Sequence, residues 1–233
     1  MRRNQLSPQE IREKLPTHLR DLVDELVRAE LRRHDDDDEE DEIDRPFPSL
    51  QKSPADELEE RGVIILDKEI SKQTLAKPSA RLLSLHLNPQ FNDTVQIVLN
   101  SPGGYTDAMW AFIDLMESSR LHIRTVAMGQ ICSAATMIFI AGDERVMAPN
   151  STTMIHHYSD VAYGTHYDLV AARKEQDMEA AKVVGHLLKH SKYSTAKEVE
   201  SKLLLKNDNW LTPTEMKKHG LCDILLKPRR RPK

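Results

Sequence analysis

Apolar residues follow two different periods through the middle of the chain. Continuous apolar runs at 62–66, 94–99 and 123–128 predict strands that are buried on both faces. Between them, apolar side chains recur every three or four positions, which predicts amphipathic helices over 71–87 and 107–119. Pro78 is expected to kink or divide the first of these helices. Alternating strands and helices predict α/β layers with parallel strands.

The pattern continues to residue 227 with weaker signals. Two short strands are expected within 145–151 and 152–158, followed by a long helix over about 167–190. The segment "LTPTEMKKHG", 211–220, predicts a capped helix, because threonine, proline and glutamate stand at its start and glycine at its end. We therefore predict one domain over 60–227 and a loose basic tail over 228–233.

The first 59 residues have a different composition. Residues 1–34 predict a helical extension, with a capping box at Ser7–Glu10 and an apolar stripe within 17–33. The acidic run "DDDDEEDEID", 35–44, cannot be buried, so 35–59 is expected to be a disordered linker. The run either only solubilises the arm or serves as an acidic tether for a partner. These appendages explain why 30% of the residues are charged.

The net charge, the lengths of the apolar runs and the number of cysteines argue against several classes of protein. The net charge of −4 argues against a nucleic-acid partner, and no apolar run reaches the roughly 18 residues of a membrane span. Cys132 and Cys222 are too few and too far apart for a disulfide framework or a zinc finger. We therefore predict a cytoplasmic protein with no membrane segment, no metal site and no cofactor.

Ser133 stands where a strand ends and an apolar helix begins, in "MGQICSAATMIFIAG". A serine at this place is either a helix N-cap or a nucleophile at the positive end of the helix dipole. As a nucleophile, it would have the backbone N–H of Ala134 beside it to stabilise an oxyanion. The adjacent Cys132 is expected to be a small buried residue, since two neighbours cannot both face one base.

A serine nucleophile requires a base, and "MIHHY" offers His156 and His157 at the end of a short strand. Alternation along the strand sends their side chains to opposite faces, so only one of them can face Ser133. For the same reason, the pair is a poor metal site. The glycine pair in "NSPGG", 100–104, either forms a tight turn or presents N–H groups to an oxyanion.

Four motifs in this order resemble the proteolytic subunit of Clp protease. They are "NSPGG", "MGQ-x-x-S", "PNS-x-x-MIH" and "W-L-T-P-x-E-x-x-x-x-G-L-x-D", and the resemblance covers residues 61–227. It implies the Clp/crotonase fold, a spiral of ββα units, and a serine endopeptidase that cuts unfolded polypeptides to short peptides without a metal or a nucleotide at the site. It also implies that Ser133 is the nucleophile, His156 the base, and Gly103 and Ala134 the oxyanion-hole residues.

The chain departs from the family at the third catalytic position. The family has an aspartate there, and counting back from Trp210 puts this position near Leu204. Asp208 is the nearest substitute and Asp160 a weaker candidate. This departure leaves a second hypothesis open, a catalytically inactive structural subunit of a mixed ring. A third is a crotonase-type acyl-CoA enzyme on the same fold.

The resemblance also implies an assembly. The family stacks two heptameric rings into a tetradecamer, and the helix over about 167–190 matches its ring-contacting segment. The partners expected from it are a polypeptide substrate, further copies of this chain and a AAA+ unfoldase. The divergent sequence also resembles copies that bacteriophages carry.

Overall fold

A computed structural model describes residues 54–159 and 161–228 of the chain. The helices predicted over 1–34 and the acidic run at 35–44 lie outside these described residues. The description below therefore concerns the unit that begins at Lys52, which is compact by itself. None of its described helices is long and apolar enough to span a membrane.

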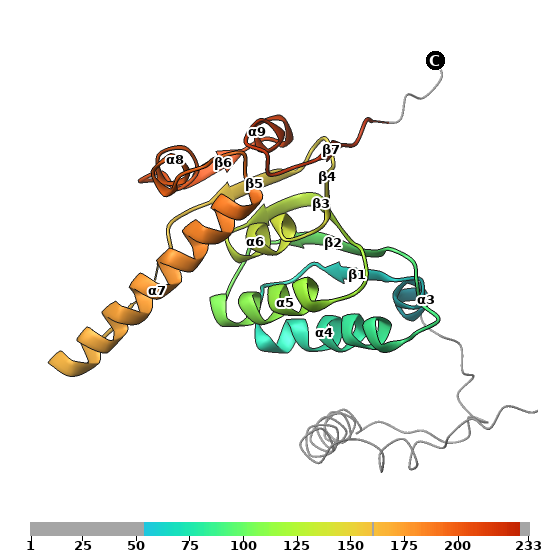
Figure 1. Ribbon diagram of the computed structural model, residues 1–233, viewed down its shortest axis with the longest axis horizontal. Coiled ribbons are helices and arrows are strands. Elements are labelled where there is room, and N and C mark those ends of the chain that lie inside the picture. The colour runs from blue at the N-terminus through green and yellow to red at the C-terminus, as the bar shows by residue number, and fades with distance from the viewer. Residues whose placement is uncertain (1–53, 160, 229–233) are drawn as a thin grey trace, which may run out of the picture. The chain divides into compact units, whose positions relative to one another are not determined.

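A mostly parallel sheet forms the centre of this unit (Figure 1). Its main path runs β1-β2-β3-β4-β7, and each neighbouring pair along it is parallel, as the sequence pattern predicts. The strands are β1 (Val63–Leu66), β2 (Val95–Ser101), β3 (Ile123–Cys132), β4 (Glu144–Met147) and β7 (Ile224–Leu225).

The sheet divides at β3, which is ten residues long. Residues 124–127 of β3 pair with β4, whereas residues 130–132 pair in parallel with β5 (Thr152–Ile155). A short strand, β6 (Asn209–Leu211), then pairs with β5 in the antiparallel direction. Because of this division, the carboxyl ends of β3 and β5 lie side by side.

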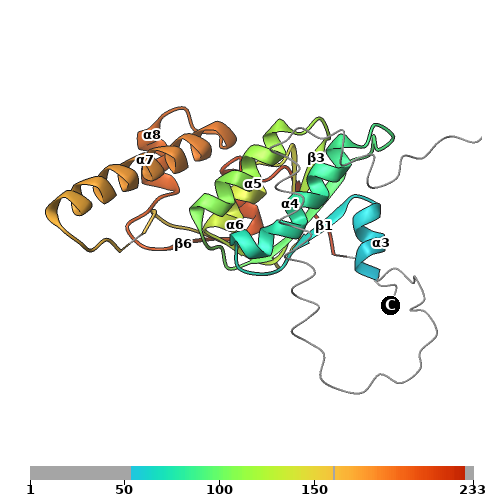
Figure 2. The same ribbon diagram turned by 90° about the horizontal axis from the view of Figure 1, so that it is seen from below.

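Helices cover the sheet and fill the core. Figures 1 and 2 both show α4 (Lys72–Leu87) and α5 (Thr106–Ser118) side by side along one face. Helix α6 (Ala134–Ile140) follows β3, and all seven of its residues are buried. The core includes Leu82, Ile97, Phe112, Ile123, Ile138 and Phe139, each at most 2% exposed.

The remaining helices lie at the two ends of the described chain. Helix α3 (Pro54–Glu60) precedes β1, in a segment where the sequence predicts a linker. Helix α7 (His166–His190) has 25 residues, and its first half projects away from the sheet (Figures 1 and 2). Helices α8 (Ala196–Lys202) and α9 (Pro213–Lys218) follow it, and all three begin with a capping box.

Of the two outcomes expected for Pro78, a kink or a division of the helix, the division is wrong. Pro78 does not divide α4, which runs without a break from Lys72 to Leu87. A proline inside a helix removes one backbone hydrogen bond. In α4, the buried side chains of Leu75, Leu82 and Leu85 on both sides of Pro78 pack against the core and hold the helix continuous.

Candidate active site

The ends of β3 and β5 bring Ser133 and His156 together. Ser133 follows β3 directly, His156 follows β5 directly, and Cys132 pairs with Met154 in the register of these two strands. The Nε2 atom of His156 lies 2.8 Å from the Oγ of Ser133, a hydrogen-bond distance. A serine hydroxyl beside an imidazole nitrogen is the arrangement that nucleophilic catalysis requires.

The backbone of Ser133 has a conformation that side chains rarely adopt. Its φ is +53° and its ψ −120°, and it is the only non-glycine residue with positive φ in the described part of the chain. Its N–H donates to the carbonyl oxygen of Met154 at 2.8 Å, so the paired strands hold this conformation. Such a backbone costs about 1–3 kcal/mol and is typical of functional sites.

The N-cap alternative does not fit this geometry. The side chain of Ser133 makes no capping hydrogen bond to α6, and its hydroxyl lies against His156 instead. Helix α6 is still essential, because its buried side chains fix the position from which Ser133 projects. Thr136, fully buried, strengthens this link through its Oγ1, which lies 3.2 Å from the carbonyl oxygen of Ile131 and 3.3 Å from that of Met154.

Ser133 and His156 open onto a cavity of about 330 Å³. Gly104, Ala134 and Met137 are among its other lining residues. As the first residue of α6, Ala134 has an N–H with no partner inside the helix, and no hydrogen bond joins it to another described residue. This N–H is therefore available to a ligand beside Ser133.

The two glycines of the "NSPGG" turn differ in this respect. Gly103 is buried, and its N–H donates to the Oγ of Ser101 at 3.2 Å. Gly104 is exposed, lines the cavity, and makes no N–H hydrogen bond to another described residue. The family resemblance implies Gly103 as an oxyanion-hole residue. The free N–H beside the cavity belongs to Gly104. A pair of adjacent glycines in a sequence does not tell which of the two has its N–H free.

Gly103 instead supports the backbone of the serine. A Cβ atom added to it would lie 2.5 Å from the carbonyl oxygen of Cys132 and 2.9 Å from the Cβ of Ser133. Its φ is +93°, a conformation that glycine adopts freely. Only glycine therefore allows the turn after β2 to approach Ser133 this closely.

Asp208 lies near the pair without a hydrogen bond to it. It is exposed and immediately precedes β6, where Asn209 pairs with Ile155. Extending this antiparallel register by one residue puts Asp208 opposite His156. Burial raises the pKa of the Cys132 thiol, and the negative charge of Asp208 raises it further. Leu204, the position to which counting back from Trp210 leads, is a buried core residue, and Asp160 lies outside the described residues.

His157 and Cys132, the chain neighbours of His156 and Ser133, lie in different surroundings from the pair. His157 is exposed and lines a different cavity from His156, as the alternation along the strand predicts. Cys132 is 4% exposed, and its raised pKa keeps it a thiol, so it is a small core residue. Neither contributes to the site.

Comparisons with known proteins all lead to one family. The model of the Clp protease family matches residues 50–229. The chain is 32% identical to "ATP-dependent Clp protease proteolytic subunit 2" of Leifsonia xyli, over 77% of this chain and 81% of that protein. It is 32% identical to subunit 4 of Streptomyces avermitilis, over 76% and 78%, and 29% identical to subunit 1 of Bifidobacterium longum, over 79% and 78%.

Proposed function

The chain belongs to the Clp protease family, and we propose that it cleaves unfolded polypeptides with Ser133 as nucleophile and His156 as general base. Family membership makes it a serine-type peptidase. The observation that carries the assignment of residues is the 2.8 Å distance between Ser133 Oγ and His156 Nε2, at the edge of a cavity.

The reaction follows from these positions. His156 takes the proton of the Ser133 hydroxyl as its oxygen attacks the carbonyl carbon of the peptide bond. The same imidazole then gives this proton to the leaving amine, and an acyl-enzyme remains. Water attacks the ester with His156 again as base, which releases the acid product and restores the serine.

The negative oxygen of the tetrahedral intermediate requires N–H donors. We assign these to Ala134, as the sequence predicts, and to Gly104 in place of Gly103. The support for Gly104 is that it lines the cavity, while the N–H of Gly103 already donates to Ser101. Loss of one such donor typically lowers kcat by about 100-fold to 1,000-fold.

A covalent label tests the proposed nucleophile. Incubation of the full chain with a fluorophosphonate should modify one residue, and peptide mass spectrometry should find the label on Ser133. The Ser133→Ala variant is the control and should take up no label. A label on another residue in the unmodified chain, or none at all in an assembled protein, would refute the assignment.

The two alternative functions are less well supported. A crotonase-type enzyme needs no serine–histidine pair, and an inactive subunit needs neither the strained backbone of Ser133 nor its contact with His156. The similar proteins quoted above all carry the name of the protease subunit. These observations favour an active peptidase.

We further propose that Asp208 orients His156. The register of β5 and β6 supports this role, because residues directly opposite in an antiparallel pair have Cβ atoms about 5 Å apart. Since Asp208 is exposed, Asp208→Asn should lower kcat by about 10-fold with KM unchanged, far less than the roughly 10⁴-fold effect of a buried aspartate. Glu200→Gln, which removes another exposed carboxylate, is the control. If kcat is unchanged in Asp208→Asn, Asp208 does not orient His156, and the proposed catalytic group consists of Ser133 and His156 alone.

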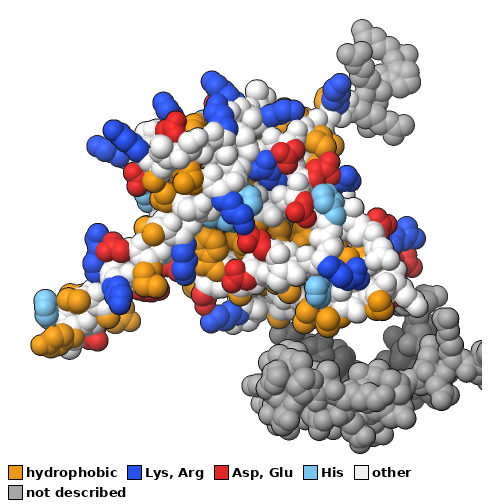
Figure 3. All heavy atoms as spheres, viewed as in Figure 1, with side chains coloured by type: hydrophobic (Ala, Val, Ile, Leu, Met, Phe, Trp, Pro, Cys, Tyr) orange, Lys and Arg blue, Asp and Glu red, His pale blue; other side chains and the backbone are white. Residues whose placement is uncertain are grey.

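We also propose that the chain assembles into rings through α7. The support is the first half of this helix, in which every described side chain is at least partly exposed. Figure 3 shows hydrophobic side chains on the visible face of this projecting helix. Tyr167 is 83% exposed, Val170 56% and Met178 53%, and apolar exposure of this extent is typical of protein interfaces. Native mass spectrometry should find a heptamer or tetradecamer, and a monomer at micromolar concentration would argue against rings. A AAA+ unfoldase and a cytoplasmic location stay predictions from the sequence.

A further inference from the structure

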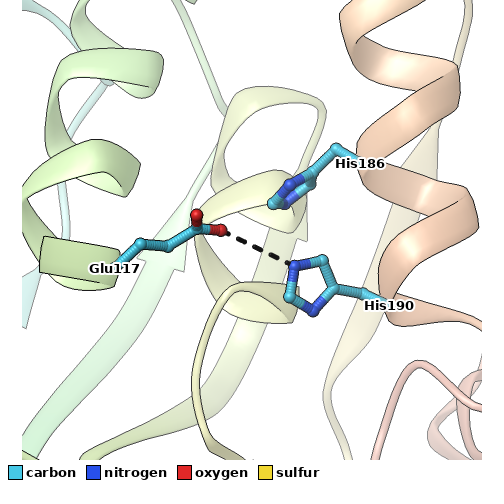
Figure 4. A group of neighbouring side chains, drawn as sticks. All are labelled: Glu117, His186 and His190. Carbon is cyan, nitrogen blue, oxygen red and sulfur yellow. Dashed lines mark ion pairs between the residues drawn. The ribbon is translucent and has the colours of Figure 1, made fainter.

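A cluster of one carboxylate and two imidazoles lies between α5 and α7, apart from the Ser133 cavity. Glu117 stands in the last turn of α5, and His186 and His190 are one turn apart on α7 (Figure 4). One ligand atom from each side chain can be chosen so that all three lie within 4.8 Å of one another. Two histidines at i and i+4 of a helix present their nitrogens on one face, which suits a shared metal ion.

His190 supplies a nitrogen that lacks a hydrogen-bond partner. This Nε2 atom is buried, and it neither accepts nor donates a hydrogen bond among the described residues. A buried imidazole nitrogen without a hydrogen bond costs folding free energy, and a metal ion would satisfy it.

His186 is held in a form suited to coordination. Its side chain is buried, and its Nε2 lies 3.0 Å from the carbonyl oxygen of Met137. A carbonyl can only accept, so Nε2 carries the proton and Nδ1 has the free lone pair. A histidine that ligates a metal commonly donates its other N–H to a backbone carbonyl in this way. Trp110 packs edge-on against the same ring and restricts its orientation.

Glu117 adds a negative oxygen to the two nitrogens. Its Oε1 lies 3.9 Å from His190 Nε2 and 2.8 Å from the ammonium of Lys189, which lowers the pKa of the carboxyl group. A metal ion must displace Lys189, whose side chain is 58% exposed and can turn into solvent. Arg145, the other nearby cation, is engaged with Asp223 and with the carbonyl oxygen of His190.

We propose that Glu117, His186 and His190 bind a divalent transition-metal ion of the Zn²⁺ class. Two nitrogens and one carboxylate oxygen suit such an ion, with water as a fourth ligand. The cluster borders two surface cavities of about 920 and 360 Å³, which give an ion access. The bound ion joins the base of the projecting helix α7 to α5, and it takes no part in peptide cleavage.

No metal site is predicted from the sequence, in which the adjacent His156 and His157 diverge along their strand. The spacing of His186 and His190, four residues apart along the predicted helix, is the sequence signal that indicates this site. Glu117 lies 69 residues before His186, and no local pattern connects the two. Only the folded chain, in which side chains of α5 and α7 meet, brings the third ligand into place.

Metal binding to the full, untagged chain tests this proposal. Equilibrium dialysis should find one tightly bound Zn²⁺ per chain, and Co²⁺ should give the intense visible absorption of a four-coordinate site with nitrogen ligands. His186→Gln and His190→Gln should each weaken binding by at least about 100-fold and abolish the Co²⁺ spectrum. Lys189→Ala should tighten binding, because it removes the competitor for Glu117.

The controls separate this site from other cation binding. His166→Gln alters an exposed histidine on the same helix and should leave affinity unchanged. The acidic run at 35–44 offers oxygens only, so ions bound there give weak Co²⁺ absorption. The proposal fails if the unmodified chain does not give the four-coordinate spectrum, or if folded His186→Gln and His190→Gln variants bind as it does. Retained fluorophosphonate labelling shows that a variant is folded.

Discussion

Ser133→Ala and His156→Ala should each lower kcat/KM for a short fluorogenic peptide by about 10⁵-fold or more, and the double variant should lower it no further. The reason is that the hydroxyl and the imidazole act as one unit, so removing either removes the whole nucleophile. The oxyanion donors stay in place in all three variants, and they account for any residual rate. Steady-state kinetics on assembled protein gives the three ratios.

Two neighbouring substitutions are matched controls for this cycle. His157→Ala removes an imidazole that lines a different cavity, and Cys132→Ala removes a buried thiol next to the serine. Both should keep kcat/KM within about 10-fold, since neither side chain touches the proposed reacting atoms. A Cys132→Ala variant as inactive as Ser133→Ala would instead identify the thiol as the nucleophile. Losses that add in the double variant would show that Ser133 and His156 act separately.

The sequence predicts the strands and helices of the core because burial determines their patterns. The apolar runs that become β1, β2 and β3 need no long-range information, and neither does the amphipathic face of α5. The fork in the sheet is different. The last four residues of β3, 129–132, begin with Gly129 and Gln130, which are typical of a turn, and residues 130–132 extend the strand because they pair with β5.

The roles of single residues depend on contacts of this long-range kind. Whether Ser133 caps a helix or faces a base depends on its φ, which is held by a hydrogen bond to Met154. The choice between Gly103 and Gly104 depends on the Oγ of Ser101. The place of Asp208 depends on the register of a three-residue strand, β6, which is too short to give a periodic signal. A resemblance to a family can supply such information, but spacing within one sequence cannot.

Gly103→Ala should disable the site without removing any catalytic group. The added Cβ would lie 2.5 Å from the carbonyl oxygen of Cys132 and 2.9 Å from the Cβ of Ser133, both far inside normal contact. The φ of +93° adds strain for any residue with a side chain. Together, overpacking and backbone strain should lower the free energy of unfolding by about 2–5 kcal/mol. The relaxation that relieves them must move residues 132–134.

A shift of about 1 Å at Ser133 should lower kcat/KM by about 100-fold, because attack on a carbonyl requires aligned reacting atoms. Gly185→Ala is the matched control. It lies inside α7 with no atom within 4 Å of the added Cβ, so it should raise the free energy of unfolding by about 0.5–1 kcal/mol and leave kcat/KM unchanged. Denaturant unfolding gives the first quantity and steady-state kinetics per folded chain gives the second, while fluorophosphonate labelling rates report the reactivity of Ser133 itself. If Gly103→Ala labels at the rate of the unmodified chain, the close approach of the "NSPGG" turn does not position Ser133.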